Sequence, residues 1–119
     1  MCAVRANFGP FASEAEALRA VLTRIVGAVD PDAIWLFGSR ARGDARPDSD
    51  FDLLVVARPG ADLDSDDYEK VDRPLNGLGI GCDVVPCAAA DFAEGLLLNT
   101  SFITRVVSEG RKVYEAARV

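Results

Sequence analysis

The sequence of 119 residues predicts a single domain of the α/β class. Apolar runs of strand length occur at residues 33–37, 51–57 and 80–85. Segments with apolar residues at every third or fourth position, as in an amphipathic helix, occur at 13–29 and 88–99. Because strands that alternate with helices pack as a sheet covered by helices, this order favours the α/β class.

The first helix is expected to begin at Ser13, because Ser13 and Glu16 form a capping box that satisfies the free N–H groups of a first turn. Asp30-Pro31 should end it. Residues 1–11 show no clear period, so we expect a loose or partner-dependent arm there. The apolar stripe of this helix comprises Ala17, Leu18, Val21, Leu22, Ile25 and Val26.

The central elements surround a glycine-rich turn. A buried strand at 33–37 should lead into Gly38-Ser39 and a short helix at about 39–44, followed by a loop at 46–49. The next strand, at 51–57, should end at Arg58-Pro59-Gly60.

The second half of the chain continues the alternation. Segment 62–76 is expected to be helical, because acidic residues near its start complement the helix dipole, and Pro74 should end or kink it. The elements expected after it are a strand at 80–85, a helix at 88–99 whose period continues at 102–107, and a final short strand at 112–115.

The turn and the strand after it carry a pattern typical of phosphate and metal binding. Gly38 lacks a Cβ, so the backbone can turn sharply and approach a ligand closely, and Ser39 offers a hydroxyl and an N–H to phosphate oxygens. Asp50 and Asp52 should project from one face, because side chains alternate along a strand. Two such carboxylates repel unless a cation neutralises them, and hard oxygen ligands suit Mg²⁺. Either half alone is typical of an ordinary turn or a solvated strand end.

Asp83 is a third candidate ligand, because it stands between Cys82 and Val84 in an apolar strand. A carboxylate in such a place needs a partner or a metal, since burying it unpaired costs several kcal/mol. The alternative is a strand-end carboxylate that accepts a hydrogen bond from a neighbouring group.

The charge distribution limits the partners. The net charge of -6 argues against standing contact with nucleic acid, which needs clustered Lys and Arg. Arg40, Arg42 and Arg46 form a local basic cluster suited to a triphosphate, or else a solvated loop. The sequence has no histidine, and its three cysteines lack metal-ligand spacing, which excludes zinc sites and histidine triads. Without a membrane-length apolar run or a signal peptide, a cytoplasmic location is expected.

Residues 38–53, Gly-Ser-Arg-Ala-Arg-Gly-Asp-Ala-Arg-Pro-Asp-Ser-Asp-Phe-Asp-Leu, resemble the signature of the DNA polymerase β-like nucleotidyltransferases. In this signature Gly38-Ser39 is followed by ten residues and then by Asp50 and Asp52. The nearest group is the minimal nucleotidyltransferases (MNT), the antitoxin partners of HEPN-domain toxins. The resemblance spans roughly the whole chain.

The resemblance implies a polymerase β-like palm, an α/β (α+β) fold with a small mixed sheet and helices mainly on one face, over residues 1–119. It places Asp83 as the third catalytic carboxylate. The implied catalytic and metal-binding residues are Asp50, Asp52 and Asp83, with two Mg²⁺ ions; the implied nucleotide-binding residues are Gly38, Ser39, Arg40 and Arg42.

The implied activity is transfer of a nucleoside monophosphate, most directly AMP from ATP, to a protein hydroxyl, a tyrosine of a HEPN-type toxin. One alternative is a non-catalytic antitoxin that blocks its partner by steric occlusion, and another is transfer to a small molecule such as an aminoglycoside. The sequence leaves open the nucleotide, the acceptor, the role of residues 1–11 and whether the chain forms homo- or hetero-oligomers.

Overall fold

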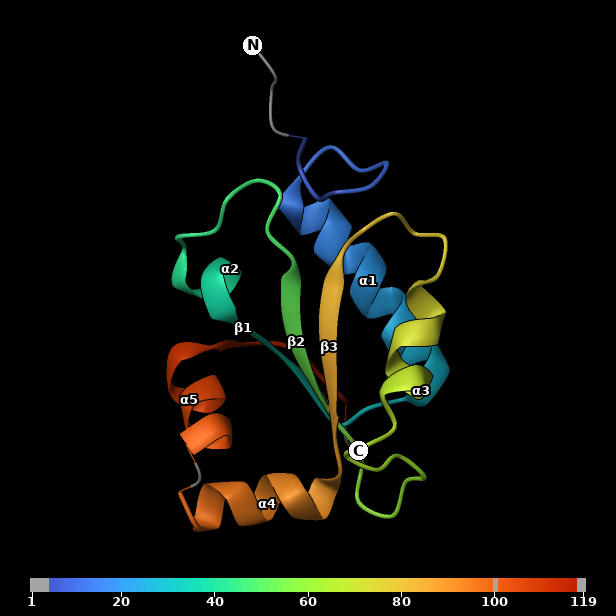
Figure 1. Cartoon of the computed structure of the whole chain (residues 1–119). Helices are drawn as coiled ribbons and strands as arrows, with labels where there is room; N and C mark the ends of the chain where they lie inside the picture. Colours follow the sequence, from blue (N-terminus) through green and yellow to red (C-terminus); the bar gives the residue numbers. More distant parts are fainter. Residues whose placement is uncertain (1–4, 100, 118–119) are drawn as a thin grey trace.

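The computed structural model describes residues 5–99 and 101–117 (Figure 1). Its strands are β1 (Ala33–Phe37), β2 (Phe51–Val56), β3 (Cys82–Cys87) and β4 (Arg111–Glu115). They form a four-stranded sheet in the order β3-β2-β1-β4. Strand β2 runs antiparallel to β1 and parallel to β3, and β1 runs antiparallel to β4. The predicted α/β class with a small mixed sheet is therefore confirmed.

The helical elements are α1 (Glu14–Val29), α2 (Gly38–Arg42), α3 (Tyr68–Asp72), the 3₁₀ turn η1 (Arg73–Leu75), α4 (Ala89–Leu97) and α5 (Ser101–Glu109). Helix α3 begins later than the predicted start at residue 62. Before it, the side chain of Asp67 accepts a hydrogen bond from the N–H of Asp64 (2.8 Å), which satisfies that N–H outside a helix. Pro74 lies in η1, where the helix narrows and ends as predicted.

The start of α1 follows the predicted cap. The hydroxyl of Ser13 accepts a hydrogen bond from the N–H of Glu16 (3.2 Å). The carboxylate of Glu16 accepts one from the N–H of Ala12 (3.1 Å), one residue before the position that a standard capping box uses. At the other end, Asp30 adopts the left-handed conformation (φ 46°) and ends the helix before Pro31.

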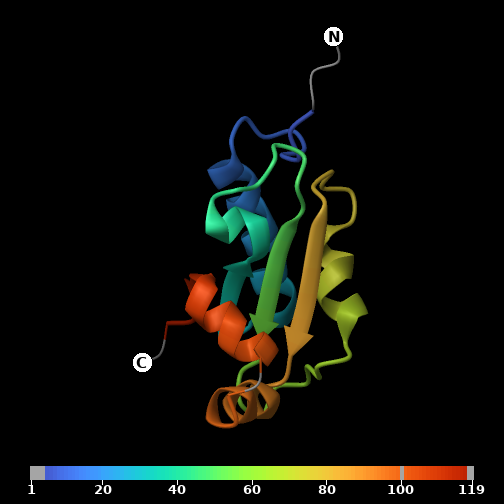
Figure 2. The same cartoon turned by 60° about the vertical axis from the view of Figure 1, so that its left-hand side comes forward.

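Apolar side chains alternate along β2 and divide the core into two clusters, one on each face of the sheet. Figures 1 and 2 show α1 and α5 on opposite sides of the strands. The helices therefore cover both faces, with α1 and α3 on one and α5 on the other, whereas the sequence predicts helices mainly on one face. The first cluster joins Phe51, Leu53 and Val55 to Ala17, Val21, Ile25 and Val71; the second joins Leu54 and Val56 to Ile103 and Val106.

Residues 7–11 differ from the loose arm that the sequence predicts at 1–11. The N–H of Asn7 donates to the carbonyl of Pro47 (2.8 Å), and the N–H of Phe11 donates to that of Phe8 (3.0 Å). Gly9 lies so close to Leu78 that a Cβ on it would stand 2.7 Å from the Leu78 carbonyl oxygen. Residues 1–4 of the expected arm lie outside the described residues. Over the part of the chain that the structure describes, no helix has the length and apolarity to cross a membrane.

Candidate active site

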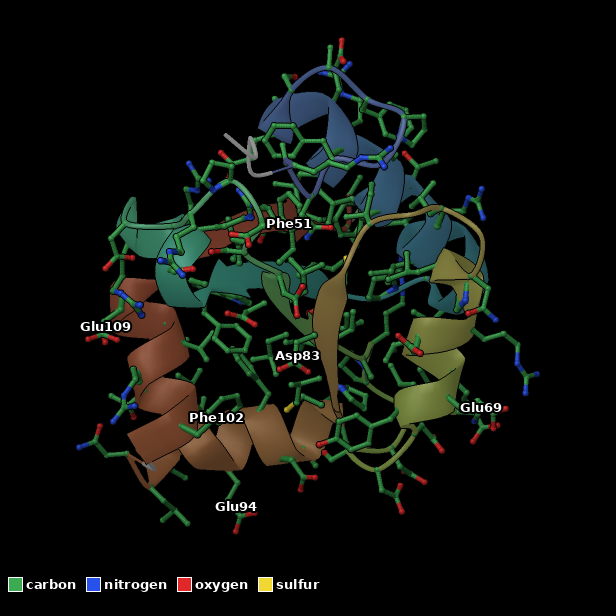
Figure 3. The ribbon with its side chains drawn as sticks, turned by 45° about the horizontal axis from the view of Figure 1, so that its top comes forward. Phe51, Glu69, Asp83, Glu94, Phe102 and Glu109 are labelled. Carbon is green, nitrogen blue, oxygen red and sulfur yellow. The ribbon has the colours of Figure 1, made fainter. Side chains whose placement is uncertain are left out.

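Two of the predicted carboxylates lie side by side at one end of the sheet. The parallel register of β2 and β3 pairs Asp52 with Asp83. Because paired residues of neighbouring strands project to the same face, both carboxylates stand on the face that packs against α5. Asp52 is half-buried and Asp83 is exposed. Figure 3 shows Asp83 on β3 and Phe102 on α5 near this face.

Asp50 approaches the site from the neighbouring loop. It is exposed and immediately precedes β2. Its Oδ1 lies against Gly81, where an added Cβ would overlap it. The N–H of Phe51 donates to the carbonyl of Gly81 (3.1 Å), so the start of β2 is tied to the residue before β3. The structure thus brings Asp50, Asp52 and Asp83 to one end of two adjacent strands.

Two features of the structure require glycine at position 38: the backbone conformation there and the nearby carboxylate of Asp52. Its φ of +72° is a conformation that residues with a Cβ rarely adopt. An added Cβ would also overlap Oδ2 of Asp52 and stand 3.0 Å from its Cγ. The glycine therefore makes room for the Asp52 carboxylate, a role beyond the close ligand approach that the sequence suggests.

The carboxylate of Asp52 experiences unfavourable electrostatics. Its pKa is raised above the ordinary 3.8, first by burial and then by the negative charges of Asp83 and Asp50, while Arg42 acts in the opposite direction. A group of carboxylates that repel one another at a strand end is a donor set suited to a hard divalent cation. The residues at this site therefore fit the predicted Mg²⁺.

Arg40 was predicted to contact the nucleotide, but its side chain is buried in contacts within the protein. It is 8% exposed, and its guanidinium stands over the ring of Phe51, 4.4 Å from the centroid. Its Nη1 donates to Glu14 (2.9 Å), and its Nη2 donates to the carbonyls of Pro47 (3.0 Å) and Ser49 (2.7 Å). Arg40 therefore holds the loop before Asp50 in place.

Arg42 remains exposed beside the glycine turn, paired with Asp44 at 3.3 Å. A cavity of about 160 Å³ opens next to Arg42 and Gly38. Its other wall is α5, which contributes Arg105. The lining residues are Phe37, Gly38, Arg42, Phe102, Arg105, Val106 and Glu109.

Arg105 is a candidate that sequence reasoning missed. It lies 63 positions after Arg42 in an ordinary amphipathic helix, so no local pattern distinguishes it from a solvated side chain. Packing of α5 against the sheet brings it to the cavity beside Arg42. The basic charge at this cavity therefore comes from Arg42 and Arg105, on two separate helices.

A second acidic group lies elsewhere, at Asp64, Asp66 and Asp67. Within residues 5–99 and 101–117, this is the one group of three carboxylates whose ligand oxygens all lie within 4.8 Å of one another. The ligand oxygens of Asp50, Asp52 and Asp83 are therefore farther apart. Asp67 also pairs with Lys70 at 3.3 Å. The hydrogen bond from the N–H of Asp64 to the Asp67 carboxylate and this ion pair hold Asp67 in place without a metal.

Comparisons with known proteins agree with the fold. Among solved structures, a candidate nucleotidyltransferase from Sulfolobus solfataricus is similar at 20% identity and a TM-score of 0.54, over 82% of this chain and 77% of that one. A toxin-antitoxin structure with AMP-PNP is similar at 22% identity and a TM-score of 0.50, over 83% of this chain and 71% of that one. No curated protein matches the sequence.

The sequence itself identifies the family. The family model described as "Nucleotidyltransferase domain" matches residues 16–113, which include all four strands up to Val113 in β4. The matched region contains the glycine turn at Gly38 and the three carboxylates that the sheet brings together. The chain therefore belongs to the nucleotidyltransferase domain family.

Proposed function

We propose that this chain is a minimal nucleotidyltransferase that moves AMP from ATP to a hydroxyl of a HEPN-type toxin and thereby acts as its antitoxin. The observation that carries the proposal is the pairing of Asp52 with Asp83 across β2 and β3, beside Gly38. Membership of the nucleotidyltransferase domain family supports the reaction. The similar fold of a toxin-antitoxin structure with AMP-PNP motivates the choice of partner and nucleotide.

In this proposal Asp50, Asp52 and Asp83 hold Mg²⁺. When bound, Mg²⁺ would neutralise charge on the triphosphate and make an acceptor hydroxyl more acidic. Asp83, the more exposed of the strand pair, would orient the acceptor hydroxyl and accept its proton. The hydroxyl oxygen forms a bond to the α-phosphorus, the bond from that phosphorus to the bridging oxygen breaks, and pyrophosphate leaves.

The phosphates are proposed to lie along the glycine turn. Gly38 and Ser39 would contact them through backbone and hydroxyl groups, and Arg42 and Arg105 would neutralise their charge from either side of the cavity. Arg40, buried in the loop contacts, would act only by holding the segment that leads into Asp50.

A non-catalytic antitoxin is the second candidate, and the exposed leucines at the end of α4 offer the contact surface that it needs. Leu97 is 84% exposed and Leu98 is 64% exposed, which is unusual for side chains of this type. A surface of this kind suits contact with another protein. It would serve occlusion and catalysis equally, so a measurement of transfer must separate them.

The test uses ATP labelled at the α-phosphate, Mg²⁺ and the protein encoded beside this chain as partner. We expect label on the partner with the wild-type chain and none with Asp52→Asn. Asp66→Asn, in the second acidic group, is the matched control and should transfer normally. Label that survives Asp52→Asn would overturn the metal assignment, and neutralisation of the partner without any label would establish occlusion.

A further inference from the structure

The side chain of Asn7 lies between the two loops that carry the proposed metal ligands. Its Nδ2 donates to the carbonyl of Ser49 (3.0 Å) and to the carbonyl of Gly81 (2.8 Å). Its Oδ1 accepts a hydrogen bond from the N–H of Gly81 (2.6 Å). Ser49 immediately precedes Asp50, and Gly81 lies two residues before Asp83.

These contacts join segments that are far apart in the sequence. Asn7 is 42 residues from Ser49 and 74 residues from Gly81. A primary amide donates twice and accepts at the same time, whereas a carboxylate donates nothing. The amide of Asn7 is therefore matched to two carbonyls and one N–H, and all three bonds are partly buried.

The position of this amide matters because the sheet ends there. The ladder of β2 and β3 ends at the pair Phe51 and Cys82, and Asp50 lies beyond it. Asn7 continues the connection between the two strands past that end. Arg40 donates to the same Ser49 carbonyl through Nε (3.1 Å) and Nη2 (2.7 Å), so this carbonyl is held by two side chains.

Asp50 itself touches this junction, because its Oδ1 lies against Gly81. A shift of Gly81 would therefore move the surface on which the Asp50 carboxylate rests. The same shift would be passed to Asp83, two residues along β3. The spacing between these carboxylates depends on how firmly the two loops are held together.

We propose that Asn7 is a positioning residue that sets the spacing of Asp50 relative to Asp83, and through it the affinity of the site for a divalent cation. The catalytic consequence rests on the proposed function, but the hydrogen bonds and the cation affinity do not. Partners of metal ligands typically change affinity or activity by about 10- to 100-fold when they are removed.

The test compares Asn7→Ala and the milder Asn7→Ser, whose hydroxyl is too short to bridge both loops, with Asn76→Ala, an exposed asparagine after η1. Amide hydrogen exchange is followed at Gly81 and at Leu53 to Val56, and Mn²⁺ binding is titrated without nucleotide. For Asn7→Ala we expect faster exchange at Gly81, protected amides in β2, and Mn²⁺ half-saturation raised by about 10- to 100-fold. In the transfer assay, kcat should fall while KM for ATP at saturating metal stays unchanged.

The proposal is overturned if Asn7→Ala matches Asn76→Ala in both Gly81 exchange and Mn²⁺ affinity. It is also overturned if Gly81 exchange rises while Mn²⁺ affinity stays constant, because the role would then be structural alone. Should Asn7→Ala lose protection throughout β2, Asn7→Ser decides by the same two criteria. A wild-type chain that transfers no nucleotide would end the proposed function, and the exchange and Mn²⁺ titrations would still decide the role of Asn7.

Discussion

The Asp52 carboxylate lies directly against Gly38, and this contact sets the geometry of the site. Gly38→Ala should lose roughly 1 to 3 kcal/mol of stability, because alanine is strained at a φ of +72°. It should also abolish transfer, because the Asp52 carboxylate must move. Gly43→Ala is the matched control: Gly43 has a φ of +84°, but an added Cβ there meets nothing within 4 Å.

Thermal unfolding and transfer assays on both variants separate the two effects. We expect both variants to lose stability and only Gly43→Ala to retain activity. Normal transfer by Gly38→Ala would show that the position of the Asp52 carboxylate is not critical.

The raised pKa of Asp52 predicts a pH dependence of stability. The folded state holds this proton more strongly than the unfolded state, so Asp52 costs stability as the pH rises from the ordinary 3.8 through the raised value. Asp52→Asn removes the charge and should therefore be more stable than the wild type at neutral pH, with the difference vanishing below the ordinary pKa.

Unfolding in EDTA between pH 3 and pH 8 measures this difference, and added Mg²⁺ should reduce it by neutralising the wild-type carboxylates. A difference in unfolding temperature that stays constant across the pH range would contradict the electrostatic origin.

Arg40 and Arg42 stand two positions apart and should respond differently to substitution. Arg40→Met should cost about 3 kcal/mol, because Glu14 loses its buried partner and the carbonyls of Pro47 and Ser49 each lose one of their two donor groups, the other being Asn7. Arg42→Met should change stability by less than about 0.5 kcal/mol, because Arg42 is exposed, and should weaken ATP binding.

Denaturant unfolding and calorimetric ATP titration of the two variants make the comparison. The reverse outcome, a stable Arg40→Met chain that no longer binds ATP, would restore Arg40 as a nucleotide ligand.

At the scale of elements, local signals predicted the strands and α1, because capping and apolar periodicity depend on neighbouring residues. β1 begins and ends at the predicted residues. The helix predicted from 62 begins at Tyr68, because the carboxylate of Asp67 accepts a hydrogen bond from the N–H of Asp64 and holds the preceding turn outside a helix. The cap at Ser13 and the strand carrying Asp83 are likewise present.

Contacts between segments that are far apart in the sequence could not be predicted from local sequence patterns. Asn7 bonds to residues 42 and 74 positions away, and no periodicity in its own segment indicates this. Arg40 and Arg42 form one basic cluster in the sequence, but residues two apart on a helix face different sides. Arg40 is buried against Phe51, and Arg42 lies beside the cavity.

Helix α4 ends in an exposed apolar surface that we expect to contact the partner. Leu97→Glu should leave the stability within about 0.5 kcal/mol of the wild type, because Leu97 is 84% exposed, and should reduce co-purification with the partner. Ala28→Glu, at an exposed position of α1, is the control. Unchanged co-purification of Leu97→Glu would place the partner on another surface.

At the scale of the whole molecule, the two faces of the sheet differ in how completely the helices cover them. One face is closed by α1 and α3 over a continuous core. The other packs against α5 but leaves the end of β2 and β3 open, where Asp52 and Asp83 project. Although the net charge of the chain is -6, two arginines, Arg42 and Arg105, line the cavity of about 160 Å³ beside this open end, together with Glu109.

The most direct test of the account is a crystal structure with Mn²⁺ and a non-hydrolysable ATP analogue, with the metal located by its anomalous scattering. The account predicts manganese in contact with Asp52 and Asp83, and the triphosphate between Gly38 and the arginines Arg42 and Arg105. Manganese bound only at Asp64, Asp66 and Asp67, with nothing at Asp52, would contradict it.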